Sequence, residues 1–272
     1  MSIRQGQSRV PNQSSIEAVR LFYRALLQAW GPQHWWPAES AFEVIVGAFL
    51  TQNTAWSNVE RAISNMRAAG VLSVEAVRRI PNEQLEQLVR PSGYFRQKAQ
   101  RLKDFISFLD TRYAGSLDRM FAALTEKLRA ELLSLKGVGP ETADSILLYA
   151  GNQPSFVVDA YTRRIFERHG IIAANSSYDE IRYLVECSLA GEIEPIASLG
   201  DEVVGGGSCH APSSMSKAIR SATAQAYNEM HALIVGVGKK HCLKAAAKCE
   251  GCPLARFLPA GNIEKCRKAP TS

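Results

Sequence analysis

The chain has 272 residues, of which 46% are hydrophobic and 21% charged, a globular composition that excludes wholesale disorder. Lysine and arginine number 32 against 26 aspartates and glutamates, a formal net charge of +6. No apolar run approaches the ~18 residues of a membrane span, and no secretory signal follows the N-terminus, so we expect a cytoplasmic protein without a membrane partner.

The apolar residues recur with helical periodicity along most of the chain. Positions 42–50 are apolar nearly all round, which predicts a buried helix. The other expected helices cover 16–30, 58–69, 83–89, 97–112, 116–123, 125–134, 143–150 and 224–237. Residues 190–224 are rich in glycine and serine, which is typical of a flexible insertion. The pattern predicts an all-α protein.

Residues 135–143 read Leu-Lys-Gly-Val-Gly-Pro-Glu-Thr-Ala and join two of these helices. Gly137 and Gly139 permit a tight turn in which Val138 plugs the core, and Pro140 suits the first turn of the next helix. The amides of such a turn and the helix N-terminus can grip a DNA phosphate. An ordinary helical hairpin would show the same pattern.

Asp159 directly follows the apolar run 156–158, about twenty residues beyond the turn. Taken alone, it would be interpreted as the N-cap of a helix. Taken with the hairpin, it resembles the helix-hairpin-helix (HhH-GPD) DNA glycosylase superfamily, whose bacterial archetype is endonuclease III. The resemblance runs from about residue 42 to 237 and resumes in the cysteines. Segments 34–37, 50–56 and 227–234 are most similar to 3-methyladenine DNA glycosylase III.

The resemblance implies a two-lobed monomer that binds double-stranded DNA containing a damaged base. A helical barrel-like lobe of residues 41–152 would end in the hairpin, and residues 1–40 with 153–241 would form the second lobe. Asp159 would lie at the mouth of the cleft between them. There its carboxylate would stabilise the positive charge that develops on the sugar as the base leaves, or orient the attacking water.

Glu141 stands where bifunctional members of the superfamily carry a lysine that attacks the sugar. A carboxylate cannot form an imine, so the resemblance implies a monofunctional glycosylase with little or no lyase activity. Its substrate would be an alkylated purine. An endonuclease-III-like enzyme for oxidised pyrimidines or mismatched thymine or uracil is the alternative, and a non-catalytic DNA-binding module is another.

Aromatic residues flank the expected helix at 42–50, in Trp35-Trp36-Pro37 before it and at Trp56 after it. The resemblance implies that Trp35 and Trp56 sandwich the flipped base, with Trp36 and Pro37 in the same pocket. An alkylated purine is cationic, and stacking it between indoles gains ~1–2 kcal/mol by cation–π attraction when desolvated. Without the resemblance, packing in the core would be the better interpretation of these aromatics.

The resemblance also implies the remaining contacts with the duplex. Gln52 would fill the hole that the flipped base leaves. A loop wedge and nearby phosphate contacts would be made by Tyr94, Phe95, Arg96 and Lys98, and the hairpin contact by Gly137, Val138 and Gly139. Positions on an ordinary surface loop would explain the loop residues equally well.

The C-terminal segment 242–272 is basic and rich in cysteine. Residues 239–272 hold six lysines, two arginines and two glutamates, which gives +6 and leaves residues 1–238 formally neutral. Cys242, Cys249 and Cys252 match the spacing of the endonuclease III iron–sulfur loop, whereas Cys266 comes eight residues later than its fourth ligand. The resemblance implies a [4Fe-4S] cluster on these four cysteines. Zinc on four thiolates or a metal-free tail are the alternatives.

Overall fold

The computed structural model of the protein describes residues 11–33, 35–190 and 213–259. Within these ranges the chain is helical, and its β-structure is limited to a single bridge between Cys242 and Ala247. The predicted all-α fold is confirmed. In the same ranges, we find no helix with both the length and the apolar character to span a bilayer.

The first half of the chain holds seven α-helices in the described residues, together with one short 3₁₀ helix. They are α1 (Gln13–Trp30), α2 (Ala41–Leu50), α3 (Trp56–Ala68), α4 (Val74–Arg79), α5 (Asn82–Val89), η1 (Arg90–Ser92), α6 (Phe95–Tyr113) and α7 (Leu117–Phe121). The second half continues with α8 (Thr125–Leu133), α9 (Pro140–Ser145), the π-helical turn η2 (Ile146–Ala150), α10 (Ala160–Arg168), α11 (Tyr178–Leu189), α12 (Ala222–Lys240) and η4 (Ala255–Phe257).

Two compact units make up the molecule. Among the described residues, unit 1 comprises 11–33, 35, 156–190 and 222–259, and unit 2 comprises 36–155 and 213–221. Within the described residues, the chain therefore passes between the units after Trp35, after Ser155 and after Ser221.

The flexible insertion predicted at 190–224 falls largely on residues 191–212, which lie outside the described residues. Of its described residues, 213–221 belong to unit 2, whereas 222–224 begin α12 in unit 1. Ser213 Oγ donates a hydrogen bond to the Trp36 carbonyl (2.9 Å), and Met215 N donates one to the Ala38 carbonyl (3.0 Å). These two hydrogen bonds join residues 213–215 to the segment that precedes α2.

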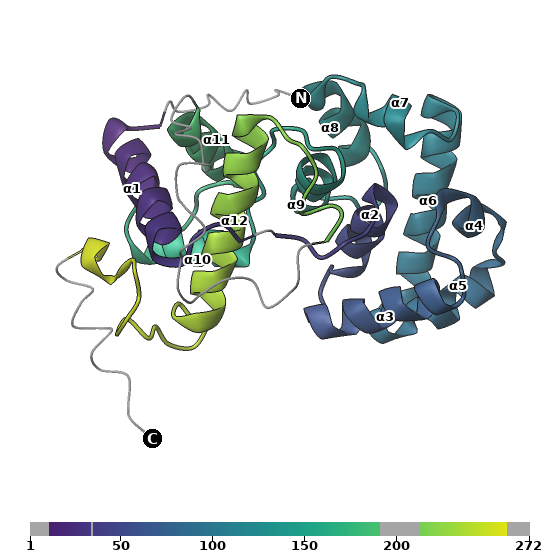
Figure 1. The fold of residues 1–272 in the computed structure, drawn as a ribbon, viewed down its shortest axis with the longest axis horizontal. Coiled ribbons are helices and arrows are strands. Elements are labelled where there is room, and N and C mark those ends of the chain that lie inside the picture. The colour runs from purple at the N-terminus through teal and green to yellow at the C-terminus, as the bar shows by residue number, and fades with distance from the viewer. Residues whose placement is uncertain (1–10, 34, 191–212, 260–272) are drawn as a thin grey trace, which may run out of the picture. The chain divides into compact units, whose positions relative to one another are not determined.

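Helix α2 forms the centre of unit 2. Ser40 caps it by accepting a hydrogen bond from Glu43 N at 3.2 Å, and residues 42–50 are all buried. It packs against α3, α6, α9 and η2, which gather around it in Figure 1. The prediction of a buried helix at 42–50 is confirmed.

A buried polar network joins α8, α9 and Ser155 in unit 2. Arg129 Nε on α8 lies 2.7 Å from Asp144 Oδ1 on α9, and Ser155 Oγ donates to the same oxygen at 2.7 Å. A buried carboxylate is tolerated when its partners satisfy it in this way. The network therefore ties the two helices of the hairpin to the point where the chain leaves unit 2.

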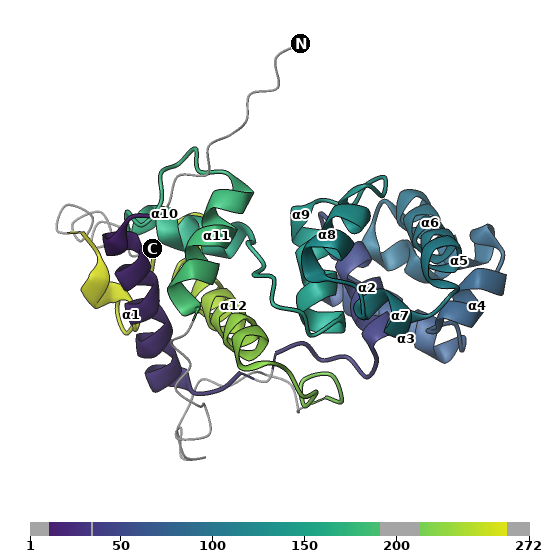
Figure 2. The ribbon, with the colours of Figure 1, turned by 90° about the horizontal axis from the view of Figure 1, so that it is seen from above.

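Unit 1 is a bundle in which α1 packs against α11 and α12, and α10 packs against α12 (Figure 2). The buried carboxylate of Glu229 on α12 accepts hydrogen bonds from Gln33 N at 2.6 Å and from Gln225 Nε2 at 2.9 Å. Helix α12 consequently fixes the segment that ends in Trp35.

Candidate active site

The helical hairpin consists of α8, the turn at 134–139 and α9. Gly137 has φ +82°, and a Cβ there would come within 2.2 Å of Arg101 Nε, so only glycine fits. Val138 is 7% exposed and its N–H donates to the Leu135 carbonyl at 3.0 Å. Pro140 begins α9, as the sequence predicts. The tight turn with a buried valine is therefore present.

Gln52 is bound to this hairpin although it comes from the loop after α2. Its Nε2 donates to the Gly137 carbonyl at 3.1 Å and to Thr142 Oγ1 at 2.9 Å. Its Oε1 accepts a hydrogen bond from Arg101 Nη1 on α6. The side chain is partly exposed and is held in one orientation by contacts on both ends.

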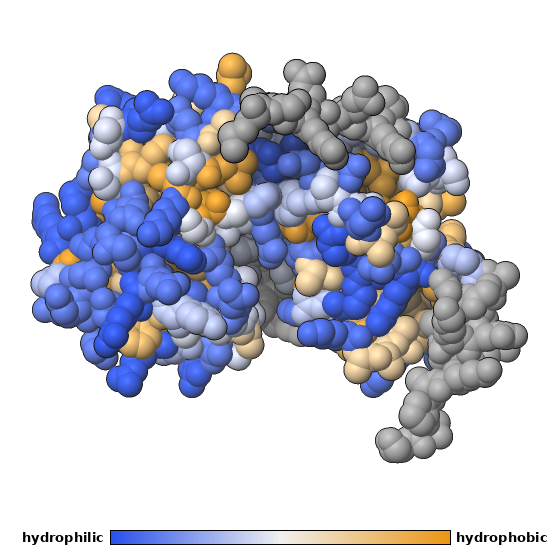
Figure 3. Space-filling view, turned by 180° about the vertical axis from the view of Figure 1, so that it is seen from behind, coloured by the Kyte–Doolittle hydropathy of each residue, from blue (hydrophilic) through white to orange (hydrophobic). Residues whose placement is uncertain are grey.

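The loop at 93–96 presents an aromatic side chain to solvent. Tyr94 is 67% exposed and has φ +46°, which follows Gly93 at φ +67° and opens α6. Figure 3 shows that apolar residues occupy limited patches on the face drawn, and Tyr94 is among the few large apolar side chains that the described residues expose. Arg90 and Arg96 lie 5.9 and 5.7 Å from the Phe95 ring centroid.

Lys98 is not placed where a phosphate contact would need it. The residue is 1% exposed, and Nζ donates to the Leu50 carbonyl at 2.8 Å and the Ser92 carbonyl at 2.6 Å. Burial lowers the pKa of Lys98 to about 8. The predicted phosphate role is therefore wrong: this lysine satisfies carbonyls at the ends of α2 and η1. Arg96, in contrast, has an 81% exposed side chain.

The Trp36 ring contacts two other aromatic rings in unit 2. The Trp36 and Trp56 centroids lie 5.5 Å apart, edge to face at 80°, and Trp36 stacks on Tyr149 at 4.7 Å. Trp36 is buried with φ +78°, a backbone conformation that a bulky residue rarely adopts. Trp56 is partly exposed, and its Nε1 donates to Glu60 Oε1 at 2.8 Å. Pro37, next in the chain, is also partly exposed.

Trp35 belongs to unit 1. Its ring is partly exposed, lies below Lys239 Nζ at 5.6 Å and contacts the His231 ring edge to face at 6.4 Å. Its indole Nε1 is buried, and none of the described residues accepts a hydrogen bond from it. Trp35 and Trp56 thus lie in different units, each held by contacts of its own unit.

Asp159 is the N-cap of α10. Its Oδ1 accepts hydrogen bonds from Thr162 N at 2.7 Å and Thr162 Oγ1 at 2.9 Å. The preceding segment is held by α11, because Phe156 N donates to Glu186 Oε1 at 2.9 Å and Val158 N donates to the Tyr178 hydroxyl at 3.2 Å. Asp159 is therefore held by its cap contacts with α10, which follows it, and by the contacts of the preceding residues with α11.

The second oxygen of Asp159, Oδ2, lies 3.6 Å from His231 Nε2 on α12. Burial would raise the pKa of this carboxyl, but the imidazole and the two Thr162 contacts outweigh burial and hold the pKa below its usual range. Asp159 is consequently an ionised, nearly buried carboxylate. His231 lies within segment 227–234 of the resemblance, but the sequence alone assigns it no role, because its contact with Asp159 arises from the packing of α12 on α10.

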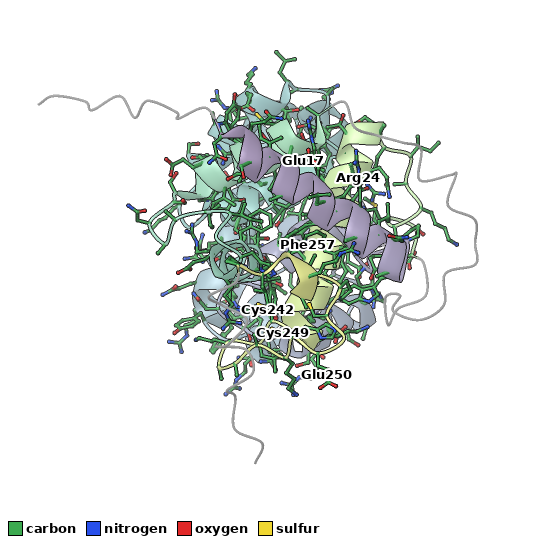
Figure 4. All side chains as sticks on the ribbon, turned by 90° about the vertical axis from the view of Figure 1, so that its left-hand side faces the viewer. Glu17, Arg24, Cys242, Cys249, Glu250 and Phe257 are labelled. Carbon is green, nitrogen blue, oxygen red and sulfur yellow. The ribbon has the colours of Figure 1, made fainter. Side chains whose placement is uncertain are left out.

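The cysteine segment follows α12 in unit 1, where Figure 4 labels Cys242 and Cys249. Cys242 is 7% exposed, and its Sγ lies 3.1 Å from Arg168 Nη1. The described residues do not gather three metal-binding side chains into one group. Cys266 lies outside the described residues. The part of the chain that is described therefore does not complete the predicted metal site.

The chain matches the model of the HhH-GPD superfamily base excision DNA repair proteins over residues 46–189. It is 41% identical over 249 residues to a Methanocaldococcus jannaschii protein provisionally named as a DNA repair glycosylase, covering 90% of this chain and 97% of that one. The chain belongs to the HhH-GPD superfamily, as the hairpin and Asp159 predict.

Solved structures agree with this assignment. H. pylori 3-methyladenine DNA glycosylase, bound to 1,N6-ethenoadenine, has 29% identity and a TM-score of 0.64 over 83% of this chain and 97% of its own. A non-covalent endonuclease III–DNA complex has a TM-score of 0.67 at 19% identity, over 93% and 99%. The latter likeness shows the shared fold. This protein is therefore a base excision repair DNA glycosylase of the superfamily.

Proposed function

We propose that this protein hydrolyses the N-glycosidic bond of alkylated purines in double-stranded DNA and leaves an intact abasic site. The observation that supports hydrolysis is the state of Asp159, whose pKa is held below its usual range although the side chain is only 11% exposed. A desolvated carboxylate of fixed orientation is the group that a developing sugar cation requires.

Asp159 acts on the sugar in this proposal. As the bond between C1′ and the base lengthens, positive charge builds on the sugar, and a preorganised anion beside it lowers the barrier. The same carboxylate can accept a proton from the water that attacks C1′. The anchoring of Oδ1 by Thr162 leaves Oδ2 as the oxygen for this work.

Stacking between two aromatic side chains provides the preference for a cationic purine. We assign Trp35 and Trp56 to the two faces of the flipped base, with Trp36 and Pro37 in the same pocket. The support for stacking on a modified purine is the partly exposed ring of Trp56, whose N–H donates to Glu60, together with 29% identity to a glycosylase that was solved with 1,N6-ethenoadenine. The preference for a cationic purine rests on the electrostatics of the indole rings. Indoles bind electron-poor rings well because of their negative π-faces.

The remaining contacts hold the duplex. We assign the wedge to Tyr94 and Phe95, which open α6 at an exposed loop, and a phosphate contact to Arg96. The hairpin residues 137–139 are assigned to a second phosphate, and Gln52, which is bound to that hairpin, to the space left by the flipped base. The protein is expected to act as a monomer.

A panel of duplexes that contain 3-methyladenine, uracil, thymine glycol or a thymine mismatch tests this proposal. Free base is quantified after single-turnover incubation with excess protein. Release from the 3-methyladenine duplex at a rate well above the others is expected. Release of an oxidised or deaminated pyrimidine alone would support the endonuclease-III-like alternative, and binding without release would support a non-catalytic module.

Glu141 leads to a prediction about reaction type. This exposed residue is the second of α9, directly after Pro140, at the position where the resemblance places the attacking lysine of bifunctional members. Borohydride should therefore trap little or no covalent protein–DNA adduct during base release. Glu141→Lys is the matched gain-of-function variant and should raise trapping. Efficient trapping by the unmodified protein would show that another amine attacks the sugar, and the monofunctional assignment would fail.

We also propose a [4Fe-4S] cluster on Cys242, Cys249, Cys252 and Cys266, supported by the spacing of the first three. Protein purified without oxygen should contain iron and acid-labile sulfide in equal amounts, with a broad absorbance near 400 nm that Cys252→Ser removes. The matched control is Cys187→Ser on α11, which should keep both. Zinc without sulfide, or protein without metal, would contradict the cluster.

A further inference from the structure

His231 lies against the one oxygen of Asp159 that the helix cap does not use. Oδ1 accepts both hydrogen bonds from Thr162, whereas Oδ2 lies 3.6 Å from His231 Nε2. The imidazole and the carboxylate come from α12 and the start of α10, helices that pack against each other. The side chains are 7% and 11% exposed, so water screens the pair weakly.

The separation indicates an ionic contact. At 3.6 Å the two atoms are too far apart for a neutral hydrogen bond, but a protonated imidazole at this distance attracts the carboxylate strongly. The ionic attraction is therefore present when His231 carries a proton, whereas a neutral His231 remains a polar neighbour of Oδ2 without that attraction.

Packing holds His231 in place. Its ring lies edge to face against Phe156, at 6.3 Å, and against Trp35, at 6.4 Å. One turn earlier on α12, the Tyr227 hydroxyl donates to the Glu186 carbonyl at 3.3 Å. The histidine is thus in contact with the proposed catalytic carboxylate and with Trp35, one of the two rings proposed to stack on the flipped base.

Other charges near the pair have partners of their own on α11. Glu186 accepts the Phe156 N–H and pairs with Arg182 Nη1 at 3.0 Å, and the Tyr178 hydroxyl accepts the Val158 N–H. The charged or titratable groups on the helices packed around α12 include Tyr23 on α1, Tyr227, Glu229 and Lys239 on α12 itself, and Arg163 and Arg164 on α10, which donate to the Ser176 and Cys242 carbonyls. Of the groups that lower the pKa of the Asp159 carboxyl, the His231 imidazole is the one that carries a charge when it is protonated.

We propose that His231 is a positioning residue that orients Oδ2 of Asp159 and, by its protonation, sets how much of that negative charge the sugar experiences. The inference rests on the proposed role of Asp159. A protonated His231 offsets the carboxylate charge that must stabilise the sugar cation, whereas a neutral His231 leaves that charge available.

The charges of Asp159 and His231 determine whether the rate of excision rises or falls with pH. The pKa of Asp159 is held low, so the carboxylate is ionised throughout the neutral range. Imidazole side chains change charge between about pH 5 and pH 8. Excision should therefore be slow at the acidic end of this range and rise as His231 loses its proton.

Single-turnover base release from pH 5 to pH 9 tests this on the full-length protein, with whichever panel duplex it cleaves. The rate of base release by the unmodified protein should rise several-fold across the histidine range. His231→Gln should flatten the profile, and His231→Phe should flatten it and also lower the maximum rate because Oδ2 loses its polar neighbour. A His231→Gln profile that rises like that of the unmodified protein would overturn the proposal.

The control is His169→Gln. His169 is another histidine of unit 1, whose ring nitrogens lie 2.9 Å from the Ile165 carbonyl and 3.3 Å from the Leu254 carbonyl. This change should leave the shape of the pH profile intact. Melting temperatures of all variants identify any loss that is due to unfolding.

A titration that needs no substrate separates this inference from the proposed function. The His231 ring protons, followed by NMR, should titrate at lower pH in Asp159→Asn than in the unmodified protein, because the anion that stabilises the imidazolium is gone. An unchanged midpoint would overturn the pairing. If no duplex in the panel loses a base, the proposed function fails, and the NMR result still decides whether the pair interacts.

Discussion

Asp159→Asn should lower the rate of base release by about a hundredfold or more while DNA binding is kept, because removing one preorganised group that stabilises transition-state charge typically has that effect. Asparagine retains an oxygen that can accept the Thr162 hydrogen bonds and is a good N-cap residue, so α10 should still begin at Ala160. Single-turnover release and equilibrium binding to an abasic-site duplex provide the two readouts.

Asp159→Ala is the control that separates the charge from the cap. It removes the carboxylate and also the acceptor for Thr162 N and Oγ1, at a cost of about 1 kcal/mol of stability. Both variants should lose excision to the same extent, and only the alanine variant should melt at a lower temperature. If Asp159→Asn retained near-normal excision, the residue would act as a cap alone.

Trp56→Ala should strongly reduce release of 3-methyladenine and leave affinity for an abasic-site duplex nearly unchanged. The abasic duplex has no base to stack, whereas a cationic base loses the π-face of the indole. Trp56→Leu should recover only part of the rate, because leucine restores apolar area without a π-face. Release, abasic-site binding and melting temperature are measured on both variants.

A purely structural role for Trp56 predicts a different result. Its edge contact with Trp36 and its hydrogen bond to Glu60 would then be the source of the effect, and stability, binding and release would fall together. Trp30→Phe is the matched control, because Trp30 is 9% exposed in unit 1 and stacks on His241. This variant should lose stability and keep its rate of release while folded.

The features that could be predicted from the sequence depend on neighbours along the chain. The need for glycine at 137 follows from a tight turn, Pro140 from the preferences of a first helical turn, and the cap at Asp159 from a carboxylate before a helix. The burial of 42–50 follows from residues that are apolar on every face.

Lys98 shows what local pattern cannot predict. A lysine in the first turn of a helix, next to an exposed basic loop, is normally solvated, but here the ends of α2 and η1 leave the carbonyls of Leu50 and Ser92 without helical partners. A buried ammonium group satisfies both. This demand arises from the packing of segments 48 residues apart, so the sequence around Lys98 carries no sign of it.

Other contacts between residues far apart in the sequence also arise from the packing of separate segments. His231 meets Asp159 because α12 packs on α10, and Gln52 meets Gly137 across 85 residues. The positive φ of Trp36 is likewise accompanied by a hydrogen bond from Ser213, 177 residues away. Periodicity locates the helices that carry or flank these residues but does not specify the partner of each one.

The most direct test of the central claim is a product analysis on one substrate. DNA that contains 3-methyladenine is incubated with the unmodified protein or with Asp159→Asn, and both products are identified by mass spectrometry. The account predicts free 3-methyladenine and an intact abasic strand from the unmodified protein, with neither from the variant above background. Cleaved strand, equal release by both proteins, or no release of 3-methyladenine by the unmodified protein would contradict it.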